Sequence, residues 1–220
     1  MRVKPIWRPS PNFGIRRGDA RPELIVIHHT AMKSCDAALE RLCDPASEVS
    51  AHFLISEKGE VFQMVEEHAR AWHAGQGSWK GITDVNSHSI GIELDNYGNT
   101  AFSESLLVAL ENLLQELLKR HGIVPDGVIG HSDMAPGRKF DPGPHFDWKR
   151  LEQKGLAGKR GTLRFDAEPN TATFRELAQS AGYTADVDDE TLLEAVRLRF
   201  RPSATGPLAA DDYSPLMPTT

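Results

Sequence analysis

The segment LIVIHH at residues 24–29 ends an apolar run with two adjacent histidines, and the rest of the fold is organised around it. A short apolar run with β-branched residues is typical of a buried strand. Two further runs, SIGIEL at 89–94 and GVIGH at 127–131, also carry an ionisable side chain at or near their ends. Strands that alternate with helical stretches predict a central sheet with helices packed on it.

Two neighbouring segments make this sheet mixed rather than wholly parallel. HFLISE at 52–57 and EVFQMV at 60–65 are separated by a short turn and predict an antiparallel hairpin. The clearest helix covers 103–121, where the leucines fall on one face, Ser103 suits the N-cap and Gly122 suits the position after the last turn. We therefore expect an α/β fold with a mixed central β-sheet flanked by helices.

The chain also contains two segments that are expected to be irregular and a separate C-terminal region. Residues 1–22 are rich in Arg, Pro and Gly and predict an irregular lead-in, and residues 66–88 predict a long glycine-containing loop. Toward the C-terminus, capping residues followed by apolar periodicity predict two helices, with a frayed chain after Pro202. We expect one domain over 1–158 and a small helical appendage over 159–220.

Charge and composition exclude some classes of partner. The net charge is −6, and residues 161–220 carry five basic and ten acidic side chains. A basic stripe for nucleic acid is lacking in the sequence, and an anionic membrane surface is an equally poor partner. With no 18-residue apolar run and no leader-like apolar region near the N-terminus, the sequence predicts a cytoplasmic protein.

The two cysteines support the same compartment. Cys35 and Cys43 flank a stretch that reads as helix, which separates them by about 12 Å and is too far for a disulfide. Reduced thiols fit a cytosolic protein.

Polar side chains gather where the predicted strands end. His28 and His29 close the first strand, Glu93 lies near the end of another, and His131 closes a third. If these strands run side by side in one direction, their ends meet at one sheet edge, where α/β folds place ligands. Period-two spacing puts Glu93 on the face that it shares with Gly91, opposite the apolar residues of its strand.

The loop after His131 adds two more groups. In GHSDMAPGRKFDPGPHF a Pro-Gly turn reverses the chain, so that Asp141 can return toward His131 with Lys139 pointing the same way. Two histidines and one carboxylate form a three-ligand zinc set that leaves one position open for water. Spacing alone does not choose between His28 and His29, because both faces of their strand are apolar.

The chain resembles the zinc-dependent N-acetylmuramoyl-L-alanine amidases of the AmpD/AmiD type, which are related to phage amidase endolysins and to peptidoglycan recognition proteins. The resemblance covers about residues 10–150, and the segment GH-x-x-x-x-PGRK-x-DPG is its most specific part. The matching segments, in chain order, are IVIHHT at 25–30, VSAHFLI at 49–55, RAWHAG at 70–75, NSHSIGIEL at 86–94 and GHSDMAPGRKFDPG at 130–143.

The resemblance implies a role for each matching residue. His28, His131 and Asp141 look like the ligands of a catalytic Zn²⁺, and the family motif thus selects the first histidine of the pair. Glu93 looks like the catalytic glutamate and Lys139 like the catalytic lysine. The implied reaction is hydrolysis of the amide between the lactyl group of N-acetylmuramic acid, or its 1,6-anhydro form, and L-alanine of the stem peptide.

Contacts with the implied muropeptide substrate are assigned more loosely. His29 is a candidate because it neighbours a ligand, and Trp72 and His73 because they lie in the glycine-rich loop. Asn86 and Arg138 are candidate anchors for the stem-peptide carboxylates, since a guanidinium binds a carboxylate through two hydrogen bonds. Each of these residues also has an ordinary structural interpretation.

The two alternatives to an amidase are a non-catalytic muropeptide-binding protein and a serine or cysteine hydrolase. A non-catalytic muropeptide-binding protein would be expected to have lost a ligand, the glutamate or the lysine, and all five are present. A serine or cysteine hydrolase lacks support, because the sequence has no G-x-S-x-G segment.

The resemblance leaves open whether recycled anhydro-muropeptides or intact wall is the substrate. It also leaves the oligomeric state open, with a monomer favoured. The C-terminal appendage resembles the small peptidoglycan-binding-like module of the AmiD branch, but its third helix is expected to be incomplete.

Overall fold

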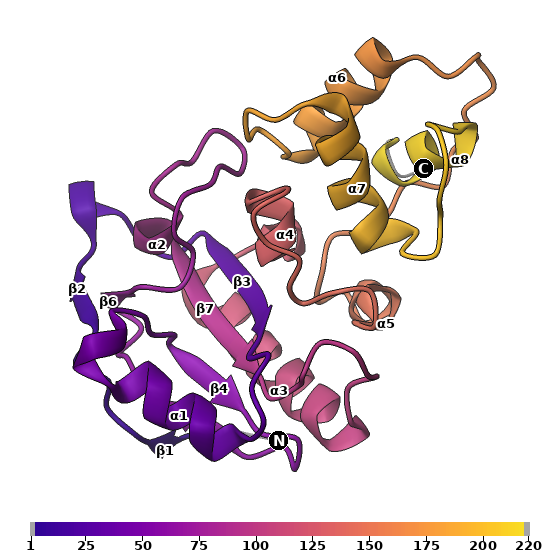
Figure 1. Ribbon diagram of the computed structural model, residues 1–220. Coiled ribbons are helices and arrows are strands. Elements are labelled where there is room, and N and C mark those ends of the chain that lie inside the picture. Colours follow the sequence, from indigo (N-terminus) through magenta and orange to yellow (C-terminus); the bar gives the residue numbers. More distant parts are fainter. Residues whose placement is uncertain (1–2, 218–220) are drawn as a thin grey trace.

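A six-stranded mixed sheet forms the centre of the computed structural model, which describes residues 3–217 (Figure 1). The strand order is β1-β5-β4-β7-β3-β8, and β4, β7, β3 and β8 run parallel to one another. β5 pairs antiparallel with β4, which is the predicted hairpin, and β1 adds a parallel edge. The strands are β1 Ile6–Trp7, β3 Leu24–His29, β4 Phe53–Ile55, β5 Val61–Gln63, β7 Ser89–Leu94 and β8 Val128–Gly130.

These strands confirm the predicted mixed α/β fold, and the segments expected to be irregular hold additional short elements. β2 (Phe13–Ile15) and β6 (Ala69–Ala71) form a separate two-stranded antiparallel sheet. The edge strand β1 and the short helix α2 (Val85–His88) also lie in segments that the sequence presented as lead-in or loop. Strands of two or three residues are too short to show a periodic pattern.

One face of the sheet is covered by α3 (Glu104–His121), which begins and ends where its capping residues predict. The Ser103 side chain accepts a hydrogen bond from the Leu106 N–H, and Gly122 closes the helix with a φ of 66°. A left-handed residue at this position is what glycine tolerates without strain. The leucine stripe of α3 packs against side chains from β3 and β7 such as Ile27 and Ile92.

The opposite face is covered by α1 (Cys35–Cys43) over β4 and β5 and, beside it, by the C-terminal helices. Leu24 and Val26 of β3 share one buried cluster with Phe174, Tyr183 and other side chains from beyond residue 170. The C-terminal segment is therefore one layer of the same core. The remaining helices are α4 His131–Met134, α5 Trp148–Gln153, α6 Thr171–Ala181, α7 Asp189–Phe200 and α8 Ala210–Tyr213.

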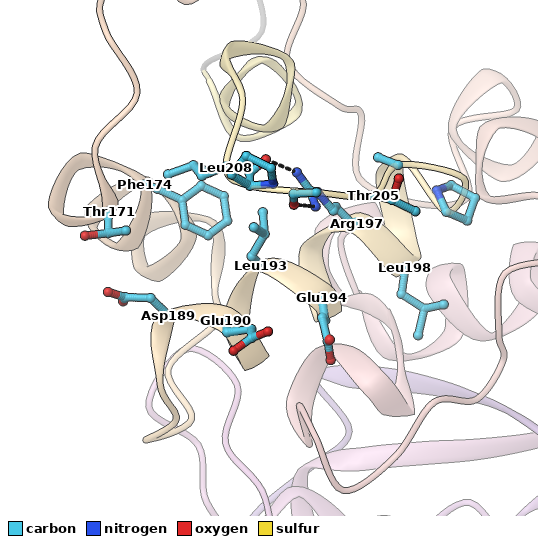
Figure 2. A pocket seen from close by; sticks show the side chains of 14 residues that line it. Thr171, Phe174, Asp189, Glu190, Leu193, Glu194, Arg197, Leu198, Thr205 and Leu208 are labelled. Carbon is cyan, nitrogen blue, oxygen red and sulfur yellow. Dashed lines mark hydrogen bonds between the residues drawn. The ribbon is translucent and has the colours of Figure 1, made fainter.

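The prediction of a frayed chain after Pro202 is wrong. Tyr213 at the end of α8 is fully buried, stacks on Phe165 at 3.9 Å between ring centroids and meets the edge of the Phe174 ring. The sequence did not predict this packing, because the prolines and small residues around Tyr213 are typical of irregular chain. A cavity of about 730 Å³ opens between α6, α7 and the chain that follows them, and Arg197 spans one side of it (Figure 2).

Both cysteines are free thiols at the two ends of α1, as their helical spacing predicts. Within residues 3–217, the helices are all too short or too polar to cross a bilayer.

Candidate active site

The parallel strands bring His28, Glu93 and the start of α4 to one edge of the sheet. Across the β3–β7 pairing His28 lies directly opposite Glu93, and β8 on the other side of β3 leads into α4, whose first residue is His131. Paired residues on neighbouring strands project from the same face of a sheet. The structure therefore brings the ends of β3, β7 and β8 to one edge of the sheet, as the sequence predicted.

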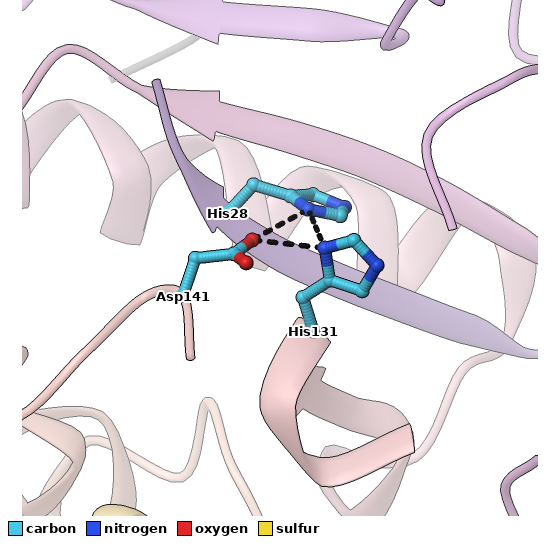
Figure 3. A group of neighbouring side chains, drawn as sticks. All are labelled: His28, His131 and Asp141. Carbon is cyan, nitrogen blue, oxygen red and sulfur yellow. Dashed lines mark hydrogen bonds and ion pairs between the residues drawn. The ribbon is translucent and has the colours of Figure 1, made fainter. Parts of the chain in front are cut away.

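Three side chains from this edge and from the following loop converge on one point (Figure 3). The Nδ1 atoms of His28 and His131 lie 2.9 Å apart, and Asp141 Oδ2 lies 2.9 Å from the first and 3.0 Å from the second. These three residues form a group that could hold a metal ion, and His28 and His131 are 2% and 3% exposed. Mutual distances near 3 Å are those of atoms that share one ion through bonds of about 2 Å.

The hydrogen bonds of the outer ring nitrogens leave the inner nitrogens free to bind a metal. His131 Nε2 lies 2.8 Å from the Ala74 carbonyl oxygen. Because a carbonyl only accepts, Nε2 carries the ring proton and Nδ1 keeps its lone pair. Such outer contacts fix both the tautomer and the ring orientation of metal-binding histidines.

His28 is fixed in the same way through His73. The Ser89 hydroxyl donates to the Val85 carbonyl at 2.6 Å, so its oxygen accepts from His73 Nε2 at 3.1 Å. His73 Nδ1 is then an acceptor, and His28 Nε2 donates to it at 3.0 Å. This series of hydrogen bonds leaves His28 Nδ1, the nitrogen that faces Asp141 and His131, without a proton.

The space for His73 is made by Gly91. A methyl group at Gly91 would lie 2.4 Å from the His73 ring, so any larger residue there would displace the imidazole. On the strand face that Glu93 shares with Gly91, the space above the glycine is therefore filled by a histidine ring.

The charges of the group suit cation binding. Burial and the neighbouring His131 together lower the pKa of His28 to about 4, although Asp141 acts in the opposite direction, so the ring is neutral near pH 7. Burial alone would raise the pKa of Asp141, but the adjacent His131 and His28 rings hold it well below its ordinary value. An ionised carboxylate and a neutral imidazole are the protonation states that a divalent metal requires of such ligands.

Glu93 has a different environment from Asp141. Burial, with the negative charge of Asp141 nearby, raises the pKa of Glu93 to about 8, although the Lys139 ammonium acts in the opposite direction. Its Oε2 atom is buried without a hydrogen-bond partner. A carboxyl group with a buried, unsatisfied oxygen and a pKa near neutrality has the properties of a general acid or base.

The group formed by His28, His131 and Asp141 opens into a cavity of about 270 Å³. Its wall contains eight of the ten residues singled out from the sequence: His28, His29, Trp72, His73, Glu93, His131, Lys139 and Asp141. The wall also includes Arg41 from α1, which the sequence did not single out because a lone arginine on a short helix is ordinary surface chemistry.

The other two residues, Asn86 and Arg138, lie outside this wall. Asn86 Oδ1 accepts from the backbone N–H groups of His73 and Ala74, at 3.0 and 2.9 Å. Arg138 donates to the Ala74 carbonyl at 2.6 Å and to the Gln76 carbonyl. Both side chains therefore shape the loop behind the ligands, and a substrate contact for either remains a prediction.

The fold and the site together define an enzyme of the hydrolase class, with a group able to hold a metal ion. Residues 18–144, more than half of the chain, match the family model Amidase_2, described as N-acetylmuramoyl-L-alanine amidase. The chain belongs to this family of amidases.

Relatives and solved structures agree with this assignment. N-acetylmuramoyl-L-alanine amidase AmiD of Escherichia coli is 33% identical over 83% of this chain and 76% of its own. The 1,6-anhydro-N-acetylmuramyl-L-alanine amidase AmpD of Enterobacter cloacae is 36% identical over 65% of this chain and 86% of its own. The structure of E. coli AmiD with anhydro-N-acetylmuramic acid-L-Ala-D-γ-Glu-L-Lys superposes with a TM-score of 0.80, covering 94% of this chain and 96% of that one at 30% identity.

A further structure, AmpDh3 of Pseudomonas aeruginosa with an anhydromuramic pentapeptide, gives a TM-score of 0.80 at 31% identity and covers 95% of this chain and 93% of its own. The family assignment confirms the amidase activity expected from the sequence.

Proposed function

We propose that the chain is a zinc-dependent amidase that hydrolyses the bond between the lactyl carbonyl of a muropeptide and the nitrogen of L-alanine. His28, His131 and Asp141 are the proposed zinc ligands. The observation that carries the proposal is their convergence: three donor atoms lie 2.9–3.0 Å apart, with both histidine lone pairs directed inward. Two imidazoles and one carboxylate suit zinc and leave a coordination position for water.

The bound metal supplies one kind of chemistry. When present, zinc acts as a Lewis acid that polarises a carbonyl and lowers the pKa of a bound water toward about 7. Proton transfer and stabilisation of the carbonyl oxygen are the proposed roles of side chains of this chain.

Glu93 is the proposed general base and acid. It takes a proton from the attacking water as the oxygen adds to the lactyl carbonyl carbon, and it gives a proton to the alanine nitrogen as the C–N bond breaks. Its raised pKa, about 8 in the absence of a metal, keeps it near the range in which it can do both. A positive charge brought into the site lowers that pKa toward neutrality.

Lys139 is the proposed partner of the carbonyl oxygen. Its side chain reaches the same cavity wall as Glu93 and Asp141. An ammonium group donates hydrogen bonds without accepting them, so it stabilises the negative charge that develops on that oxygen during attack. His29, Trp72 and His73 line the same cavity and are the proposed neighbours of the sugar and peptide groups.

The proposed substrates are soluble muropeptides with a 1,6-anhydro or a reducing-end sugar. Support comes from AmiD and AmpDh3, whose structures hold anhydro-muropeptides, and from AmpD, whose name specifies the anhydro sugar. We also propose that the enzyme acts as a monomer. We place it in the cytoplasm, where anhydro-muropeptides from wall turnover are recycled.

Mass spectrometry of the products tests the reaction and the sugar preference together. The zinc-loaded protein is incubated with an anhydro-muropeptide and, separately, with its reducing-end counterpart. We expect a free stem peptide that begins with L-alanine and a sugar that retains its lactyl group. Cleavage within the peptide, or no cleavage by zinc-loaded protein of either substrate, would refute the assignment. A strong preference for the reducing-end sugar would refute the recycling role.

A further inference from the structure

Asp133 is a buried carboxylate that fixes the start of the helix carrying a metal ligand. It lies in α4, two residues after His131, and is 1% exposed. Its Oδ2 accepts a hydrogen bond from the Gly130 N–H at 2.7 Å, at the junction between β8 and α4. The carboxylate therefore sets the turn from which the His131 side chain projects.

Two side chains from the C-terminal segment complete the hydrogen bonding of Asp133. The Tyr183 hydroxyl donates to Oδ1 at 2.8 Å, and Arg199 Nη1 of α7 donates to Oδ2 at 2.5 Å. Tyr183 is 2% exposed and Arg199 is 7% exposed. Both partners thus bind the carboxylate in the interior, where charge-assisted hydrogen bonds are strong and an unpaired charge is costly.

Arg199 also binds the groups on either side of this junction. Its Nη2 donates to the Val128 carbonyl of β8 at 3.3 Å, and its guanidinium lies 3.9 Å from the centre of the Trp148 ring of α5. One side chain of α7 therefore contacts the strand before His131, the helix that contains it and the helix that follows the ligand loop.

The same segment holds the loop on the other side of His131. The Gly81 N–H donates to the Thr184 hydroxyl oxygen at 2.9 Å, and the Lys80 N–H donates to the Gly182 carbonyl at 2.9 Å. This loop begins just after Ala74, whose carbonyl accepts from His131. The C-terminal segment therefore contacts both the β8–α4 junction before His131 and the loop that follows Ala74, whose carbonyl accepts from His131.

A buried ion pair is a poor device for stability alone. Apolar residues of similar volume often stabilise a protein as well as such a pair does, whereas the pair demands one particular geometry. The Arg199–Asp133 pair joins residues 66 positions apart and is added to an apolar contact that already docks the segment. The pair therefore differs from apolar packing in the fixed geometry that it imposes, and not in how much it stabilises the protein.

We infer that the C-terminal helical segment is a positioning element of the metal site, in which Arg199 and Tyr183 hold Asp133 so that α4 presents His131 at the correct place. The inference rests on the proposed function, since it concerns the same metal ligands. Arg199 and Tyr183 are positioning residues and do not touch the substrate.

Metal affinity in the full chain tests the inference. Zinc binding is measured by competition with a chromophoric chelator, the visible spectrum is recorded after Co²⁺ substitution, and the melting temperature is measured for each protein. The variants are Arg199→Met, which removes the pair, and Tyr183→Phe, which removes only a hydroxyl. Arg197→Met is the matched control, because Arg197 is a buried arginine of the same helix whose partner Asp212 lies within the C-terminal segment.

We expect Arg199→Met to weaken zinc binding by about 10- to 100-fold and to change the Co²⁺ spectrum, as loss of an outer partner of a ligand does. Tyr183→Phe should weaken binding less but measurably, and Arg199→Lys should restore part of the loss. Arg197→Met should lower the melting temperature and leave both metal readouts unchanged.

Wild-type zinc affinity in a folded Arg199→Met protein would overturn the inference. If that variant fails to fold, wild-type affinity and spectrum in Tyr183→Phe would overturn it instead. An equal loss of affinity in Arg197→Met would also overturn it, because the effect would then reflect general stability. Failure of the wild-type chain itself to bind zinc would refute the proposed function and is distinct from all of these results.

Discussion

His28 and Glu93 are register partners on the adjacent parallel strands β3 and β7. The backbone pairing of the two strands therefore sets the position of the proposed acid–base group relative to one proposed ligand, and no loop is involved. His131 and Asp141 are brought in from α4 and from the loop after it. This division means that the metal and the proton-transfer group can be removed separately by substitution.

Replacement of His131 by alanine should abolish metal binding and activity together. The substitution removes one of three ligands and leaves the Asp141 carboxylate with a single imidazole partner, so the affinity for zinc falls by orders of magnitude. Metal content by atomic emission after dialysis checks the prediction, with the exposed His68→Ala protein as control. One zinc per chain in the His131→Ala protein would show that this residue is not a ligand.

Replacement of Glu93 by glutamine should separate metal binding from catalysis. Glutamine has nearly the same shape and cannot exchange the proton, so we expect full zinc content and a kcat lowered by about 10²- to 10⁴-fold. Single-turnover kinetics on an anhydro-muropeptide, together with metal analysis of the same sample, provide the measurement. Turnover within a few-fold of the wild type would remove Glu93 from the chemistry.

The burial of Glu93 also predicts how stability depends on pH in the metal-free protein. The folded carboxyl has a pKa of about 8, against 4.5 as the ordinary value. Between these values the folded state binds more protons than the unfolded state, so the free energy of unfolding falls as the pH rises and the loss is complete above about pH 8. Glu93→Gln removes this dependence.

The two proteins should therefore differ most at alkaline pH. We expect Glu93→Gln to exceed the wild type in free energy of unfolding by on the order of 2 kcal/mol at pH 8, less than the full shift implies because the side chain borders the cavity, and by little at pH 4.5. Urea titrations in the presence of a chelator supply the values. The exposed Glu57→Gln is the control, and parallel curves for Glu93→Gln and wild type would show that Glu93 titrates normally.

The sequence predicted those parts of the site that rest on local patterns. The apolar runs with β-branched residues located β3 and β7, and period-two spacing placed Glu93 on the same face as Gly91. The choice of His28 over His29 needed the family motif, because a strand buried on both faces gives no preference between adjacent residues.

Contacts between distant segments could not be predicted in this way. Asp133 appears in the sequence as an ordinary polar residue of a loop, and its pairing with Arg199 exists only after the C-terminal helices dock. Asn86 and Arg138 looked like free anchors because a single sequence does not show that backbone groups already use their polar atoms. Long-range pairing is set by tertiary packing, which local propensity does not encode.

The support of His28 by His73 gives the last prediction. Gly91→Ala places a methyl group 2.4 Å from the His73 ring, so the imidazole must move away from His28 Nε2. We expect zinc affinity to fall by about 10-fold or more, as for loss of an outer partner of a ligand. The matched control is Gly14→Ala on strand β2, where the nearest atom to the added methyl group is Trp72 Nε1 at 4.0 Å.

A double variant distinguishes the lost hydrogen bond from the steric clash. In Gly91→Ala/His73→Ala the ring is absent and the methyl group has space, so the melting temperature should recover relative to Gly91→Ala alone. Zinc affinity should stay low, because His28 Nε2 still lacks its acceptor and the tautomer with a free Nδ1 is no longer favoured. Recovery of affinity together with stability would mean that Gly91→Ala acts only by distorting the sheet, and His73 would then have no part in orienting His28.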